Sequence, residues 1–183
     1  NRQPEFSQID MEMSYVEEPE QVMSIAENLI REVFRQCLDM ELDEHIRRIP
    51  YQEAMSRWGS DKPDTRFGLE IIDVSDVAAK CDFKVFADAL AIKGIIKGSV
   101  RAINAKGFAS KLSRKDIDAL GEYVKTLGAK GLAWLSYPEG GEIKGSFLKF
   151  LTPENIAELS AATDFKPGDV LFFAADKDYV VFN

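Results

Sequence analysis

Residues 5–16 contain the first side chains in the sequence whose types and spacing could bind a ligand. Polar and apolar residues alternate there with period two, which is typical of a half-buried strand. Side chains at i, i+2 and i+4 on one face lie about 7 Å apart, so they could line a cleft and contact several groups of one ligand. An ordinary solvated sheet face has the same pattern. The polar face carries Gln8, Asp10, Glu12 and Ser14, and the apolar face Ile9, Met11, Met13 and Tyr15.

A second polar cluster lies in GSDKPD at residues 59–64. Ser60, Asp61 and Lys62 place a hydroxyl, a carboxylate and an ammonium in one tight turn. The stretch around them is rich in Gly, Ser, Asp and Pro, which indicates an ordered loop or hinge. A purely structural turn would have the same composition, so the sequence pattern leaves both interpretations open.

The sequence does not support three familiar kinds of site. His45 is the only histidine, and no serine or cysteine motif lies beside it, so we expect a solvated side chain rather than an activated nucleophile. Cys37 and Cys81 lack zinc-binding spacing, and we expect two reduced thiols in the core. GxGxxG and GxxxxGK[ST] are absent, which argues against the common phosphate-binding loops. We therefore expect no metal-binding site.

Composition indicates a globular chain whose charge is unevenly distributed. Of its 183 residues, 45% are hydrophobic, and no run of 18 apolar residues predicts a membrane span. The net charge of −8 argues against nonspecific binding to DNA. Residues 1–65 contain 7 basic and 15 acidic side chains, whereas residues 66–183 contain 16 of each. We therefore expect two parts of different structure.

The elements that would position these residues also differ between the two parts. A helix is expected from Pro19 to about Leu38, and residues 47–55 should lead into a brief helix. Beyond Arg66 we expect about four or five strands and three helices, with helix caps at Ser113 and Thr152. Strands are expected within residues 67–73, 82–86, 94–107 and 166–176, with a hairpin at 132–145 that turns at Gly140 and Gly141.

Several segments together resemble one enzyme family. RQPEFSQIDMEMSY, at residues 2–15, resembles the second half of motif 2 in bacterial-type aspartyl-tRNA synthetases of class II. YQEAMSRWGSDKPDTRFGLEI, at residues 51–71, resembles the segment that leaves their catalytic sheet. LSRKDID, YVKTLGAKGLAW and VLFFAAD resemble the domain inserted into their catalytic domain, which has a counterpart in the B subunit of tRNA-dependent amidotransferases. The chain is identified as an internal fragment of such an enzyme.

The resemblance implies an α+β fold in two parts. Residues 1–66 would be a partial class II catalytic domain, with one strand of its antiparallel sheet, a helix and the GSDKPD loop. Residues 67–183 would be the inserted α+β domain, with a mixed or antiparallel sheet, and their last few residues would lead back to the catalytic domain.

The resemblance also implies a function for the longer parent protein. That protein would be a cytoplasmic, homodimeric ligase that uses ATP and Mg²⁺ to activate L-aspartate as aspartyl-adenylate, and then transfers it to the 3′ end of tRNA. The fragment would lack the first half of motif 2 and the motif 3 arginine, so its catalytic set is incomplete and we expect it to be inactive. Carried over by position, Gln3 would contact ATP. Asp10 would belong to the aspartate-recognition network, with Gln8 and Glu12 as secondary candidates. The active-site rim would contain Ser60, Asp61 and Lys62.

Two other functions are compatible with the sequence. Residues 66–183 could act as an independent module that contacts tRNA or a protein, as in the amidotransferase B subunit. A steep salt dependence of tRNA binding would favour that module. Alternatively, the polar strand face is solvated and the chain is an interaction domain. Neither alternative predicts a membrane partner.

Overall fold

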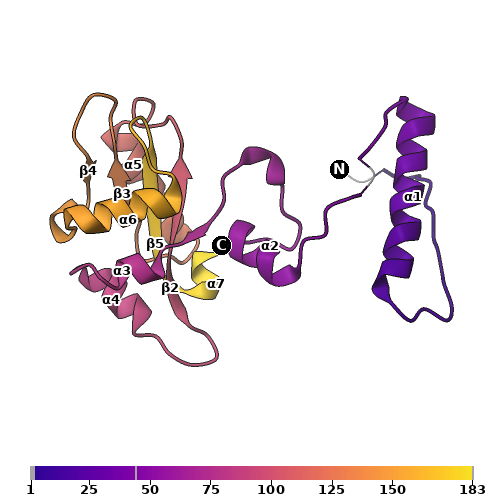
Figure 1. Cartoon of the computed structure of the whole chain (residues 1–183), viewed down its shortest axis with the longest axis horizontal. Coiled ribbons are helices and arrows are strands. Elements are labelled where there is room, and N and C mark those ends of the chain that lie inside the picture. Colours follow the sequence, from indigo (N-terminus) through magenta and orange to yellow (C-terminus); the bar gives the residue numbers. More distant parts are fainter. Residues whose placement is uncertain (1–2, 44, 183) are drawn as a thin grey trace. The chain divides into compact units, whose positions relative to one another are not determined.

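The computed structural model describes residues 3–43 and 45–182 (Figure 1). Its backbone contacts divide the chain into two compact units, Asn1–Arg48 and Ile49–Asn183. The domain boundary expected between residues 66 and 67 stays a prediction.

The first unit contains one long helix. Helix α1 spans Pro19–Leu38, as the sequence predicted. Pro19 occupies the first turn, where its missing N–H costs no helical hydrogen bond. Asp39 ends the helix in the left-handed conformation, with φ of 51°. The apolar stripe of α1 is nevertheless exposed by 41–47% at Val22, Ile25, Ile30 and Val33.

The strand predicted for residues 5–16 is not formed. Residues 3–16 adopt no strand, and all of their side chains are exposed. A strand is stable only where a neighbouring strand satisfies its N–H and C=O groups. Among the described residues of the first unit, none forms a strand that could supply those bonds. The alternating pattern is therefore not sufficient by itself to form a strand in this unit.

The second unit is built on an antiparallel sheet of five strands in the order β1-β2-β5-β3-β4. At its centre, β2 (Gly98–Ala105) pairs with β5 (Val170–Lys177) along all eight residues. Strand β3 (Ala133–Ser136) pairs with the first half of β5 only. The edge strands β1 (Ile72–Asp73) and β4 (Lys144–Gly145) have two residues each. The α+β class and the antiparallel sheet are thus confirmed.

The longer helices of the second unit begin at the predicted caps. The Ser113 side chain accepts the N–H of Asp116 at the start of α5, and that of Thr152 accepts the N–H of Asn155 at the start of α6. The helices are α2 (Tyr51–Trp58), α3 (Ser75–Ala78), α4 (Lys84–Leu90), α5 (Arg114–Thr126), α6 (Pro153–Thr163) and α7 (Asp178–Val181), with 3-10 turns at Thr65–Phe67 and Leu148–Phe150.

Two predictions for residues 67–183 were wrong. Residues 82–86 were expected to form a strand, but most of them enter helix α4, because Phe86 and Ala89 are three residues apart and both pack into the core. The described part of this region also contains five α-helices rather than three. The two additional helices are α4, where a strand was expected, and α7, which has only four residues and is too short to show a helical period.

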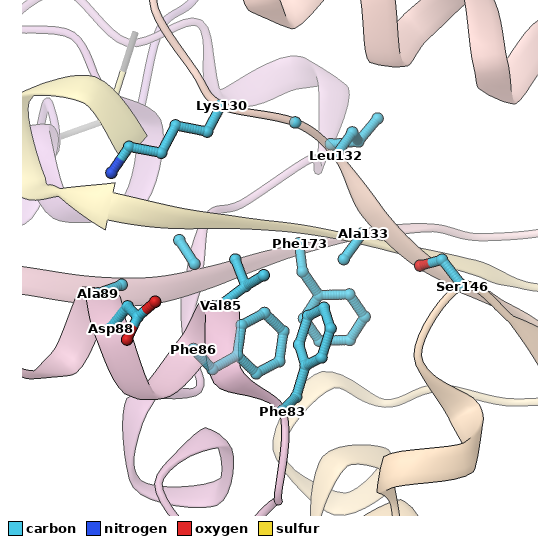
Figure 2. A pocket seen from close by; sticks show the side chains of 12 residues that line it. Phe83, Val85, Phe86, Asp88, Ala89, Lys130, Leu132, Ala133, Ser146 and Phe173 are labelled. Atoms are coloured by element: carbon cyan, nitrogen blue, oxygen red, sulfur yellow. The ribbon is translucent and has the colours of Figure 1, made fainter.

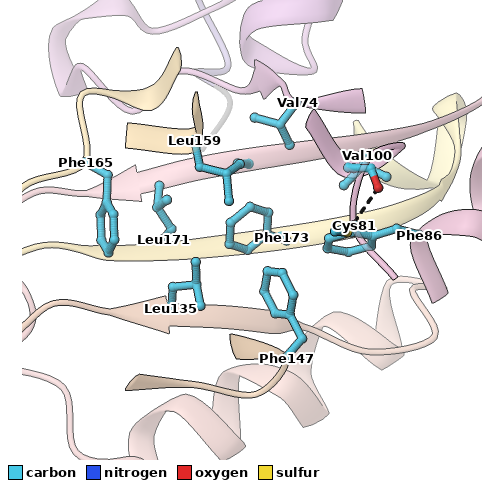
Figure 3. Packing of buried hydrophobic residues seen from close by; sticks show 12 residues of the cluster. Val74, Cys81, Phe86, Val100, Leu135, Phe147, Leu159, Phe165, Leu171 and Phe173 are labelled. Atoms are coloured by element: carbon cyan, nitrogen blue, oxygen red, sulfur yellow. Dashed lines mark hydrogen bonds between the residues drawn. The ribbon is translucent and has the colours of Figure 1, made fainter. Parts of the chain in front are cut away.

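The core lies on one face of the sheet, against α3, α4 and α6 (Figure 3). Leu171 and Phe173 of β5 are fully buried there. The ring of Phe147 meets that of Phe173 edge-on, with centroids 5.1 Å apart. The residues that alternate with them, Phe172 and Ala174, point to the opposite face. Helix α6 crosses the front of the sheet in Figure 1, and α5 lies behind it.

Candidate functional site

The polar residues predicted near the N-terminus are exposed in the first unit. Gln8 Nε2 donates a hydrogen bond of 2.6 Å to Asp10 Oδ1, which shows that these two side chains share one side of the segment. Gln3 and Glu12 lie elsewhere along the same exposed segment. The first unit thus brings together Gln8 and Asp10, but it encloses neither.

Glu27 holds the first unit together. It is only 6% exposed, and no other described side chain of residues 3–48 is buried. Its carboxylate accepts the N–H of Ile46 and a hydrogen bond of 2.9 Å from Arg48 Nη2, and Arg31 Nη2 lies 3.4 Å away. The Arg48 bond, followed by the Ile46 bond, lowers the pKa of Glu27 to about 2. This network fastens residues 46–48 to α1.

Sequence reasoning missed the Glu27 network. Its signal was a charged face on the predicted helix, because Glu20, Glu27 and Arg31 are spaced i, i+7 and i+11. Arg48 contacts Glu20 at 2.7 Å as well as Glu27. Charged residues with this spacing lie on one face of the helix, where Glu20 and Glu27 both pair with Arg48.

The GSDKPD loop is closed at its base by Arg57 in the second unit. The Arg57 guanidinium donates to both carboxylate oxygens of Glu70, at 3.0 Å from Nε and 2.7 Å from Nη2. The Ile71 N–H donates to the Arg57 carbonyl at 2.7 Å. Gly59 ends α2 with φ of +66°, and a Cβ there would lie 2.1 Å from the Phe182 carbonyl oxygen. Both ends of the loop are therefore fixed by contacts within this unit.

The tip of the loop presents polar groups to solvent. Asp61 and Lys62 are exposed, and Ser60 Oγ accepts the Lys62 N–H at 3.1 Å. Asp64 accepts the Arg66 N–H at 3.1 Å and its side chain at 2.8 Å. The Arg66 side-chain bond, with the backbone bond, lowers the pKa of Asp64 to about 2. The structure thus keeps Ser60, Asp61 and Lys62 in one turn, as predicted.

A cavity of about 360 Å³ lies between α4, the segment before β3, and β5 (Figure 2). The rings of Phe83, Phe86 and Phe173 line it, with Asp88 and Lys130 toward one end. Lys130 Nζ lies 3.1 Å from Asp176 Oδ2. The sequence did not predict this cavity, because its wall combines residues from four segments that are far apart along the chain.

The remaining candidate residues form no further site. The described residues contain no group of three or more His, Cys, Asp and Glu side chains that could hold a metal ion. His45 is exposed, as expected. Cys81 is buried, as expected, but Cys37 is exposed rather than in the core, because the described residues of the first unit bury no apolar side chain. In the described part of the chain, no helix has the length and apolar character needed to cross a membrane.

Comparison with known proteins identifies relatives whose sequences are similar to this chain. Residues 86–183 match the family model described as the GAD domain. The whole chain is 48% identical to the aspartate–tRNA ligase of Ruminiclostridium cellulolyticum. Over 181 residues it is 51% identical to the aspartate–tRNA(Asp/Asn) ligase of Symbiobacterium thermophilum, which covers 99% of this chain. The chain spans about 30% of the length of each of these relatives.

The matched residues include four of the five strands, β2 to β5, together with α5, α6 and α7. They make up more than half of the chain, and the similarity to the ligases extends through the segments on their N-terminal side. The chain therefore belongs to the GAD domain family and corresponds to the segment of bacterial aspartyl-tRNA synthetases that contains this domain.

Proposed function

We propose that this sequence is part of an aspartate–tRNA ligase that activates L-aspartate with ATP and transfers the aspartyl group to the 3′ end of tRNA. The observation that carries the proposal is the sequence identity of 48–51%, along essentially the whole chain, to relatives with that name. The longer protein would act as a homodimer in the cytoplasm. The attacking groups belong to the substrates, so protein side chains contribute positioning and charge stabilisation rather than a nucleophile.

Asp10 would act in recognition of the aspartate substrate. Two carboxylates repel each other, so Asp10 would orient a hydrogen-bond donor or a cation that faces the substrate rather than bind it directly. Its bond with Gln8 supports this role, because an amide fixes the carboxylate without neutralising its charge. Gln3 would contact ATP, and Gln8 and Glu12 would be secondary members of the network around Asp10.

The GSDKPD loop would form the active-site rim. Arg57 and Glu70 close its base, so the half-buried Ser60 and the exposed Asp61 and Lys62 are presented by a loop whose ends are fixed. An ammonium such as that of Lys62 suits the phosphates of ATP or tRNA. In this proposal the loop contributes orientation at the edge of the substrate site.

The described residues do not by themselves make a magnesium site. Mg²⁺ prefers several oxygen ligands in octahedral geometry, and no cluster of three acidic side chains occurs in the described part of the chain. We therefore assign no step of the reaction to a metal held by these residues. Because the chain spans about 30% of the length of the related ligases, we expect the 183-residue chain alone to have an incomplete catalytic set and to be inactive.

The test is aspartate-dependent exchange of pyrophosphate into ATP, measured for the chain and for the longer protein. The chain alone should give background exchange.

In the longer protein, Asp10→Ala should lower kcat/KM for aspartate by about 10- to 100-fold, because a bond to a charged partner would be lost. Glu17→Ala is the matched control, since this exposed carboxylate lies outside the alternating face. Normal kinetics for Asp10→Ala would remove Asp10 from the recognition network, and no exchange by the longer protein would refute the proposed function.

The GAD domain could instead serve as a contact module for tRNA or protein. In a neighbouring hollow along α5, the three cations are paired with acids, which disfavours a phosphate-binding strip there. These pairs are Arg114 with Asp118 at 2.9 Å, Lys125 with Glu122 at 2.7 Å, and Lys130 with Asp176 at 3.1 Å. If this region has a macromolecular partner, its charges fit a polypeptide better than RNA.

A further inference from the structure

The second half of β5 has an open edge. Strand β2 pairs with β5 along its whole length, but the pairing with β3 ends at Phe173. Residues 174–177 therefore have a strand neighbour on one side only within the described part of the chain. Residues 129–132 lead into β3, yet no backbone hydrogen bond joins them to β5 among the described residues. Such an edge presents backbone groups that can pair with another extended chain.

Two apolar cavities lie on opposite faces of the sheet at this edge. The cavity of about 360 Å³ is lined by Phe173 and Ala175 of β5. A second cavity, of about 210 Å³, is lined by the alternating residues Phe172 and Ala174. Leu132 lines both cavities. The cavities therefore lie where successive side chains of an added strand would point, because neighbouring residues of a strand face opposite sides.

Apolar side chains supply most of both walls. The first cavity contains the aromatic rings of α4 and its preceding residue, and the second lies between the sheet, α5 and α7. The first is lined by Phe83, Val85, Phe86, Ala89, Leu132, Ala133, Phe173 and Ala175, and the second by Ile71, Ile103, Val124, Leu127, Leu132, Phe172, Ala174, Val180 and Val181. A strand placed between them would bury consecutive apolar residues, not alternate ones.

Charged side chains surround the edge. The Lys130–Asp176 ion pair spans from the 129–132 segment to β5, and the Lys130 side chain is 77% exposed. Lysines at exposed edges commonly discourage uncontrolled strand pairing. Asp88 lines the first cavity and is exposed, and it has no ion-pair partner among the described residues. A basic residue of the bound chain would complement Asp88.

We propose that this surface, the open edge of β5 with its two flanking cavities, binds an extended polypeptide by strand addition. Two consecutive apolar side chains enter the two cavities, and a basic residue lies beside Asp88. A helix presents one apolar stripe and cannot fill cavities on both faces of a sheet. RNA would meet cations that are already paired. We call this surface the β5 edge site.

The experiment uses the isotope-labelled 183-residue chain and the synthetic peptide acetyl-Lys-Val-Ile-Val-Gly-amide. Binding should slow amide hydrogen exchange at least tenfold at the alternate residues of 174–177 whose N–H groups point away from β2, because these open groups become paired. Ala175→Leu fills the first cavity and Ala174→Leu fills the second, so each should weaken binding at least tenfold. Ala162→Leu, on an exposed position of α6, should change the affinity less than twofold.

Replacing the central isoleucine of the peptide with aspartate should abolish binding, and this control does not depend on the folding of any protein variant. The proposal is overturned if the peptide at millimolar concentration leaves the exchange of these open N–H groups of residues 174–177 unchanged. It is equally overturned if the peptide with aspartate binds with the same affinity as the peptide with isoleucine. Full affinity in folded Ala174→Leu and Ala175→Leu would overturn it too. Chemical-shift changes confined to one cavity without slowed exchange would identify a small apolar-ligand site and would also contradict strand addition.

Discussion

The two units of this chain differ most in what they bury. Residues 3–48 carry the predicted substrate-binding face, yet their apolar helix stripe is exposed and the buried side chain among them is Glu27. Residues 49–182 instead bury a continuous cluster centred on Phe147, Leu171 and Phe173. A unit with its own apolar core can fold alone, whereas a unit held by a charged network needs further surface to cover its apolar side chains. The comparison teaches that the residues proposed to bind ATP and aspartate belong to a different unit from the stable core, whereas the proposed rim loop belongs to the same unit as the core.

The largest expected effect comes from removing core packing in the second unit. Phe147→Ala should lower the free energy of unfolding by about 3–5 kcal/mol, because Phe147 is fully buried and packs against three other rings. Phe6→Ala in the first unit is the matched control, since Phe6 is 76% exposed and should change stability by about 0.5 kcal/mol or less. Denaturant unfolding measures both. Equal losses would contradict the assigned difference in burial.

The sequence predicted much of the second unit because its signals are local. The caps at Ser113 and Thr152, the hairpin around Gly140 and the apolar run of β5 each depend on a few neighbouring residues. Prediction failed where a distant contact decides the structure. Phe86 enters a helix because its ring packs against Phe83 and Phe147, and residues 5–16 form no strand because a partner strand is not available in their unit.

A smaller effect is expected in the first unit at acidic pH. The pKa of Glu27 is lowered to about 2 in the folded chain, against an ordinary value of about 4.3. Its contribution is therefore fully present above pH 4.3 and is lost as the pH falls toward 2. The amide chemical shift of Ile46 should follow this loss with a midpoint near 2, and Glu27→Gln should remove the transition.

Glu32→Gln is the matched control for that titration. Arg35, followed by Gln36, also lowers the pKa of Glu32 to about 2, but Glu32 has no contact with Ile46 among the described residues. The Ile46 transition should therefore persist in Glu32→Gln. A midpoint near 4.3 in the unmodified chain would show that Glu27 does not fasten residues 46–48 to α1.

The smallest expected effect concerns the reactivity of the two cysteine thiols. Cys37 is exposed, whereas Cys81 is buried and its thiol donates to the Ala78 carbonyl at 3.1 Å. Burial raises the pKa of the Cys81 thiol, so less reactive thiolate forms there near neutral pH. A maleimide should label Cys37 roughly tenfold faster or more. Cys37→Ser should remove the fast phase and leave the slow one, and a fast phase that persists would contradict the burial of Cys81.

The candidate site was also only partly predictable, because some of its contacts join residues that are distant in the sequence. Period-two spacing was enough to place Gln8 and Asp10 on one side, and the GSDKPD composition was enough to predict a turn with Ser60 at its start. The Arg57–Glu70 closure joins residues 13 positions apart, and the β5 edge site assembles residues from several strands and helices. Such long-range arrangements leave no periodic signal in the sequence.

The central difference between the units is tested most directly by excising residues 49–183 and following thermal unfolding by circular dichroism. We expect a single cooperative transition within roughly 5 °C of that of the second unit in the whole chain, because the core lies entirely within the excised residues. Residues 1–48 alone should show no cooperative transition. Loss of cooperative unfolding in the excised unit would contradict the conclusion that its core is self-sufficient.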